Sequence, residues 1–185
     1  MVAIKMSKNL NQAGLDNCQR EVRLLKHANS VSSQFTERIV SLLDDFRFRN
    51  HLCLVFELLG SNDLYKEIKR SQMTGLARIS QIKRVVEQIV QGLCHLKECG
   101  IVHCDLKPEN VIYTSEAKNE VKIVDLGSAC SRKERGFAYV CSRYYRAPEM
   151  VLSRKADYTC AVDMWSLGCI TAELYNGLPL FLASS

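Results

Sequence analysis

With 185 residues, of which 47% are hydrophobic and 24% charged, the chain has the composition of a globular protein of one domain or slightly more. Its net charge of +5 is mild and no aromatic-basic motif accompanies it, which argues against nucleic-acid binding, and no run reaches the roughly 18 apolar residues of a membrane span. The nine cysteines include no C-x-x-C pair and the N-terminus carries no signal peptide, so we expect reduced thiols in a cytosolic or nuclear protein.

The N-terminal segment VAIKM is a predicted strand in which an apolar alternation ends at Lys5. A strand that ends in lysine is common, so this lysine indicates a site only if an acidic partner lies nearby. Residues 15–28 form a predicted helix with an apolar face at spacings of three and four, and Asp16 or Asn17 could cap it. Glu21 lies beside that face. It is either a solvated carboxylate or the partner of Lys5, and we favour the pair.

The middle of the chain predicts two strands and two helices. Residues 39–48 and 52–58 are apolar runs typical of strands, and the polar residues 61–63 then begin a helix. A long amphipathic helix follows over residues 79–96, and Gly100 is a suitable residue to end it.

The stretch IVHCDLKPENVIY, residues 101–113, carries the functional hypothesis. It reads as a short apolar strand, a polar loop and a second apolar strand. The loop brings Asp105, Lys107 and Asn110 within six residues of one another, while the strands on either side bury their apolar side chains. This arrangement predicts a functional loop held on a rigid support.

The remaining elements complete the pattern. A strand is predicted over residues 120–124 and is followed directly by Asp125-Leu126-Gly127. Residues 128–149 read as an exposed segment rich in arginine and serine, which ends in Ala-Pro-Glu. Residues 159–176 form a predicted helix that is apolar around most of its surface, with Trp165 in the core.

These segments together resemble eukaryotic protein kinases over nearly the whole chain. V-A-I-K, H-C-D-L-K-P-E-N, D-L-G and A-P-E stand in the order of the kinase motifs, with Cys104 where most kinases have arginine and Leu126 where they have phenylalanine. The runs HCDLKPEN, LCLVFELL, SRYYRAPE and DMWSLGC look like the dual-specificity tyrosine-regulated kinases and their homeodomain-interacting relatives. Those families belong to the group that includes cyclin-dependent, MAP and glycogen synthase kinases. The alternative, a polar surface loop with a chance match, is disfavoured because the match is long and ordered.

The resemblance implies roles for the residues of the loop and its surroundings. Asp105 would accept the proton of the attacking hydroxyl, and Lys107 would steady the γ-phosphate. Asn110 and Asp125 would bind Mg²⁺. Asp163 stands where the family has an acid that holds the backbone of the catalytic loop.

The same resemblance implies an ATP site. Lys5 would hold the α- and β-phosphates of ATP, oriented by Glu21. Backbone groups of residues from Glu57 to Leu59 would hydrogen-bond adenine, and Phe56 would stand at the back of the adenine pocket, a position that also suits a core aromatic.

In the related kinases the exposed segment carries a tyrosine that the enzyme phosphorylates itself, and Tyr139 stands at that place. A phosphate there could pair with Arg143 and Arg146, whereas an ordinary loop aromatic is the alternative. Phe137 stands where some relatives have a second tyrosine, so one site is expected. The basic residues of this region form either a solvated face or a surface for phosphate or an acidic partner. They are Arg132, Lys133, Arg135, Arg143, Arg146, Arg154 and Lys155.

The expected fold is α+β, a bilobal protein-kinase-like fold with residues 1–58 in a partial N-terminal lobe and residues 59–185 in a partial C-terminal lobe. No G-x-G-x-x-G precedes Lys5, so we expect a fold truncated at both ends, without the glycine-rich-loop strands and the late C-lobe helices. Two functions follow. The first is a serine/threonine kinase, with tyrosine autophosphorylation as an added activity, that uses ATP and Mg²⁺ on protein substrates. The second is an inactive kinase-like fragment or pseudokinase that acts as a binding module.

Overall fold

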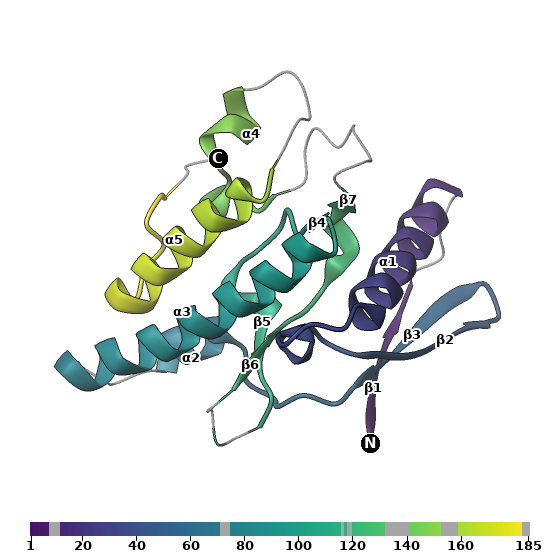
Figure 1. The fold of residues 1–185 in the computed structure, drawn as a ribbon, viewed down its shortest axis with the longest axis horizontal. Helices are drawn as coiled ribbons and strands as arrows, with labels where there is room; N and C mark the ends of the chain where they lie inside the picture. The colour runs from purple at the N-terminus through teal and green to yellow at the C-terminus, as the bar shows by residue number, and fades with distance from the viewer. Residues whose placement is uncertain are drawn as a thin grey trace.

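A computed structural model describes residues 1–7, 12–70, 75–115, 117, 120–131, 141–152 and 159–182. Its N-terminal part is an antiparallel sheet in the order β1–β3–β2 with one long helix, α1, beside it (Figure 1). These elements are β1 (Val2–Met6), α1 (Gln12–Ser30), β2 (Leu42–Phe48) and β3 (His51–Glu57). Lys5 pairs with Leu54 in this sheet, so the predicted lysine strand lies at the edge of a three-stranded layer.

The rest of the chain is mainly helical. Helices α3 and α5 pack against each other, and two short strand pairs, β4–β7 and β5–β6, lie between α3 and the N-terminal part (Figure 1). The elements are α2 (Leu64–Arg70), α3 (Gly75–Glu98), β4 (Ile101–Val102), β5 (Val111–Tyr113), β6 (Val121–Ile123), β7 (Cys130–Ser131), α4 (Pro148–Leu152) and α5 (Ala161–Asn176). The predicted α+β class is confirmed, whereas the division at residues 58 and 59 stays a prediction.

Local sequence signals explain where α2 begins and where α3 ends. The Asp63 carboxylate accepts the backbone N–H of Lys66 at 2.8 Å, which caps α2. Helix α3 ends at Glu98, and Gly100 follows with φ +68°, a left-handed value that glycine adopts without strain. None of the helices in the described ranges combines the length and hydrophobicity needed to cross a membrane.

Two predicted boundaries are wrong. Helix α1 begins at Gln12, so Asp16 and Asn17 lie inside it as exposed residues and neither caps it. Strand β2 begins at Leu42, because Ile39 and Val40 join β6 instead: the N–H of Val40 donates to the carbonyl of Ile123 at 3.0 Å. The apolar run is continuous in sequence, but its first residues are buried between the sheet and the β5–β6 pair.

The prediction that Trp165 lies in the core is also wrong. Its exposed fraction is 38%, and its ring stacks on Phe181 with 5.8 Å between centroids. Helix α5 is apolar on most sides, so sequence periodicity could not tell which side packs on α3. Val162, Leu167 and Ile170 are among the residues of α5 that the fold buries.

Replacing Gly60 by alanine should destabilise the fold. The N–H of Gly60 donates to the carbonyl of Tyr113 at 2.8 Å, and an added Cβ would lie 2.8 Å from the same oxygen. Because the backbone cannot retreat without losing this bond, we expect the free energy of unfolding in urea to fall by about 1–3 kcal/mol. Gly168→Ala in α5 is the control, since its Cβ would meet no described atom within 4 Å. Equal stability of the two variants would contradict the prediction.

Candidate active site

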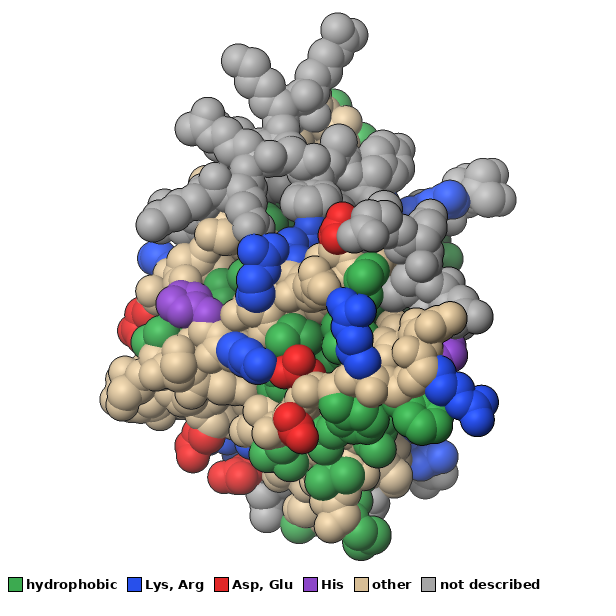
Figure 2. All heavy atoms as spheres, turned by 90° about the vertical axis from the view of Figure 1, so that its right-hand side faces the viewer, with side chains coloured by type: hydrophobic (Ala, Val, Ile, Leu, Met, Phe, Trp, Pro, Cys, Tyr) green, Lys and Arg blue, Asp and Glu red, His purple; other side chains and the backbone are tan. Residues whose placement is uncertain are grey.

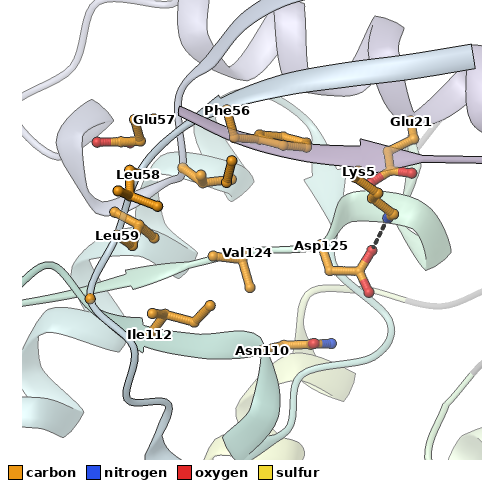
Figure 3. A pocket seen from close by; sticks show the side chains of 13 residues that line it. Lys5, Glu21, Phe56, Glu57, Leu58, Leu59, Asn110, Ile112, Val124 and Asp125 are labelled. Atoms are coloured by element: carbon orange, nitrogen blue, oxygen red, sulfur yellow. Dashed lines mark hydrogen bonds and ion pairs between the residues drawn. The ribbon is translucent and has the colours of Figure 1, made fainter. Parts of the chain in front are cut away.

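One cavity lies between the three-stranded sheet and the β5–β6 pair, with a volume of about 420 Å³. Its walls change along its length (Figure 3). Phe56, Ile112 and Val124 give it an apolar part, and Lys5 and Asp125 meet at the other end. Such a cavity suits a ligand with a flat apolar ring at one end and an anionic group at the other.

The charged end is organised by Lys5. Its Nζ donates to Glu21 Oε1 at 2.7 Å and to Asp125 Oδ1 at 2.8 Å (Figure 3). Strand alternation directs Lys5 into the cavity, whereas Ile4 and Met6 point to the other face and are exposed. The pair of Lys5 with Glu21 that we favoured from the sequence is therefore present, and it joins α1 to β1.

Electrostatics keep this end charged. Burial would lower the pKa of Lys5, but the two carboxylates offset it and raise the pKa above its ordinary value. Burial also opposes ionisation of Asp125, yet the hydrogen bond and charge of Lys5 lower its pKa. Burial raises the pKa of Glu21, which is only 3% exposed, although Lys5 opposes that shift. An ammonium group is thus held at neutral pH where an anionic group of a ligand would lie.

The loop between β4 and β5 presents a carboxylate in a fixed orientation. Asp105 Oδ1 accepts the backbone N–H of Ser142 at 2.9 Å, and Oδ2 accepts Lys107 Nζ at 3.0 Å. The amide nitrogen of Asn110 donates to the backbone carbonyl of Asp105 at 2.9 Å. Asn110 also lines the cavity, so the loop and the cavity share a residue, and no donor among the described residues bonds its amide oxygen. Ser142 was not among the sequence-predicted site residues.

Two buried side chains hold this loop from below. Asp163, on α5 and 2% exposed, accepts the N–H groups of His103 and Cys104 at 2.9 and 3.0 Å. The ring of His103 lies between Asp105 and Val124: Nδ1 accepts the N–H of Asp105 at 3.3 Å, and Nε2 donates to the carbonyl of Val124 at 3.1 Å. His103 therefore connects the loop to the cavity wall next to Asp125 by hydrogen bonds.

The whole chain, residues 1–185, matches the sequence family described as protein kinase domain. The chain belongs to the protein kinase family. The serine/threonine-protein kinase ppk15 of Schizosaccharomyces pombe is 44% identical over 186 residues, which cover 100% of this chain and 34% of that relative. The dual specificity protein kinase YAK1 homolog of Arabidopsis thaliana is 45% identical, with 100% and 19% covered. The human dual specificity tyrosine-phosphorylation-regulated kinase 3 is 38% identical, with 97% and 30% covered.

These relatives confirm the narrower resemblance to the dual-specificity tyrosine-regulated kinases that the sequence motifs predicted. The chain spans about a third or less of the length of the curated relatives it matches.

In the segment that joins the two parts of the chain, one backbone group of the predicted adenine-binding run has a partner in the sheet. The N–H of Glu57 donates to the carbonyl of Ser41 at 3.2 Å, because strand pairing continues to the end of β3, so this amide is not available to adenine. Within the described residues, no hydrogen bond uses the N–H of Leu59, which lines the cavity. The Glu57 carboxylate accepts Lys122 Nζ at 2.7 and 2.8 Å. Sequence reasoning missed Lys122, whose only signal was a lysine between apolar residues of a strand.

Cys104, the departure from the usual kinase loop, fills a buried position. It is 4% exposed, has φ +65°, and its Sγ lies 3.5 Å from Sγ of Cys130. The contact with the second thiol and burial raise the pKa of Cys104, so it is a neutral thiol. An arginine here would overfill the space between β4 and β7. The loop between β4 and β5 therefore keeps its shape without a cation at that residue.

Of the three predicted regulatory residues, the structure describes Arg143 and Arg146, and Tyr139 lies outside the described residues. Arg146 Nε donates to the carbonyl of Cys141 at 3.1 Å, and Arg143 is exposed beside a second cavity that Lys107 also lines. The positions that lie outside the described residues are Tyr139, Phe137, Arg132, Lys133, Arg135, Arg154 and Lys155. The role of Tyr139 stays a prediction.

Proposed function

We propose that this chain binds ATP with Mg²⁺ and transfers the γ-phosphoryl group to serine or threonine hydroxyls of protein substrates. The observation that carries the proposal is the shared position of Lys5, Asp125 and Asn110 at one end of an apolar cavity, with the backbone of Asp105 held by the Asn110 amide. Membership of the protein kinase family and the similarity to serine/threonine and dual specificity protein kinases support it.

The cavity suits a nucleotide. Phe56, Ile112 and Val124 would enclose the adenine ring, and the N–H of Leu59 would donate to it. The phosphates would then extend toward Lys5, whose ammonium is already held in place by Glu21. Because that ammonium is fixed before binding, the lysine side chain would lose little conformational entropy when the nucleotide binds.

The residues at the charged end fit a magnesium ion. Asn110 offers an amide oxygen and Asp125 a carboxylate, the oxygen ligands that Mg²⁺ prefers, and phosphate oxygens would supply more. Among the described residues no cluster of three or more His, Cys, Asp or Glu could hold a metal by itself. The bound ion would offset negative charge on the phosphates.

The loop residues provide the acceptor side of the reaction. Both oxygens of Asp105 already hold one donor each, and each has a further lone pair for the proton of a substrate hydroxyl. Lys107 lies next to that carboxylate, so its ammonium would attract the moving phosphoryl group. Asp105 raises the pKa of Lys107 despite partial burial, so this lysine stays charged.

The dual-specificity part of the proposal rests on Tyr139. Two of the relatives carry the words dual specificity in their names, and the family resemblance puts a self-phosphorylated tyrosine at this residue. A phosphate on Tyr139 would be within the same segment as Arg143 and Arg146, which could pair with it.

The test is transfer of label from γ-labelled ATP to a serine- and threonine-rich protein and to the chain itself. We expect labelled phosphoserine and phosphothreonine on the substrate, labelled phosphotyrosine only on the chain, and no transfer when EDTA replaces Mg²⁺. Nucleotide binding without transfer under any condition would favour a binding module instead.

A further inference from the structure

Arg20 is a buried cation that touches the turn next to Asp125. It comes from α1, directly before Glu21, and only 8% of it is exposed. Its Nη2 donates to the backbone carbonyl of Gly127 at 3.2 Å. Arg20 is not among the residues that line the cavity, so its effect on a ligand would pass through Gly127.

The turn that Arg20 contacts determines where Asp125 points. Gly127 is the middle residue of a single 3-10 turn, Leu126–Ser128, and Asp125 caps it by accepting the N–H of Gly127 at 3.3 Å. Asp125 has φ +63°, a left-handed conformation that a residue other than glycine keeps only when its surroundings hold it. A shift of the turn would therefore change the direction of the Asp125 carboxylate.

Adjacent residues of α1 hold this turn at two points. Glu21 acts through Lys5 on the Asp125 side chain, and Arg20 acts on the Gly127 backbone. Helix and turn approach so closely that a Cβ on Gly127 would lie 3.3 Å from Glu21 Oε2. Two separate attachments to one rigid helix prevent the turn from rotating. With a single attachment the turn could still rotate.

We propose that Arg20 is a positioning residue for phosphoryl transfer: it holds the turn Leu126–Ser128 against α1 and so directs the Asp125 carboxylate toward the metal. This inference rests on the proposed function, in which Asp125 binds Mg²⁺. A guanidinium suits the role because it stays charged and donates in fixed directions. A charged donor to a carbonyl also forms one of the stronger hydrogen bonds in proteins.

The first test needs no nucleotide. Hydrogen exchange is measured on the full chain and on Arg20→Met and Arg23→Met, where Arg23 is an exposed arginine of the same helix. The reporter is the N–H of Ala129, which closes the turn by donating to the carbonyl of Leu126 at 3.0 Å. We expect it to exchange about tenfold faster in Arg20→Met, the loss expected for one charge-assisted hydrogen bond. Exchange in Arg23→Met should match the parent.

Unchanged exchange at Ala129 in Arg20→Met would overturn the proposal. Equal acceleration throughout α3 would overturn it as well, because it would show that Arg20 serves overall stability alone.

The second test measures how much Mg²⁺ tightens binding of ADP. In Arg20→Met the factor should fall about tenfold, as it does when a residue that orients a metal ligand is lost, while ADP affinity in EDTA stays at the parent value. Arg23→Met should keep the full factor. Equal losses with and without Mg²⁺ would contradict a role in directing Asp125. If the parent chain binds no ADP, the proposed function fails, and hydrogen exchange alone decides whether Arg20 holds the turn.

Discussion

Replacing Asp105 by asparagine is expected to lower the rate of phosphoryl transfer about a thousandfold, the contribution typical of a positioned general base. Asparagine has nearly the same shape and keeps an oxygen that can accept the N–H of Ser142. It loses the charge that accepts a proton and that attracts Lys107 at 3.0 Å. The rate is measured as label transferred from γ-labelled ATP at saturating Mg²⁺.

Nucleotide binding separates this effect from misfolding. Asp105 does not line the cavity, so ADP affinity of the variant should stay within about twofold of the parent. The matched control is Asp45→Asn, which removes a carboxylate paired with Lys26 at 2.6 Å on the surface and should leave the rate unchanged. Equal transfer by the parent and the Asp105 variant would remove the enzyme hypothesis for this chain and leave the binding module.

Most of the site could be predicted from local sequence, because the site residues lie in short segments whose conformation follows from the local pattern. Strand alternation is enough to direct Lys5 to one face, and helical spacing places Glu21 beside the buried face of α1. The loop from β4 to β5 keeps Asp105 and Asn110 close together in sequence, and the Asn110 amide donates to the Asp105 carbonyl within the loop. Bringing Asp125 to 2.8 Å from Lys5 depends on the fold, and there the prediction drew on the family resemblance.

The sequence could not predict contacts between distant segments when the residues involved belong to no recognisable motif. Lys122 pairs with Glu57, and Arg20 reaches Gly127, across separations of 65 and 107 residues. A lysine in a strand or an arginine on a helix is usually solvated, so neither residue type signalled a partner. The sequence also did not show which side of α5 faces the core, because a helix that is apolar on most sides has no polar face to mark its exposed side.

Replacing Asp163 by asparagine should destabilise the fold and the site together. The two carboxylate oxygens accept the N–H groups of His103 and Cys104, and an asparagine offers only one acceptor. Its amide nitrogen would face one of these donors in a site that is 2% exposed. Burial raises the pKa of Asp163, so the neutral side chain would also relieve a cost of burying charge. The unsatisfied donor outweighs that relief, and we expect the free energy of unfolding to fall by about 2 kcal/mol.

The loss should extend to the site, because Asp163 supports the backbone just before Asp105, where Cys104 has φ +65°. We therefore expect transfer to fall in Asp163→Asn even at temperatures where urea titration shows the variant fully folded. Asp45→Asn, which breaks a surface pair, should cost less than about 1 kcal/mol and no activity. A variant of Asp163 as stable as the parent would mean that the loop between β4 and β5 keeps its shape without this carboxylate, and the account of how α5 supports the loop would be wrong.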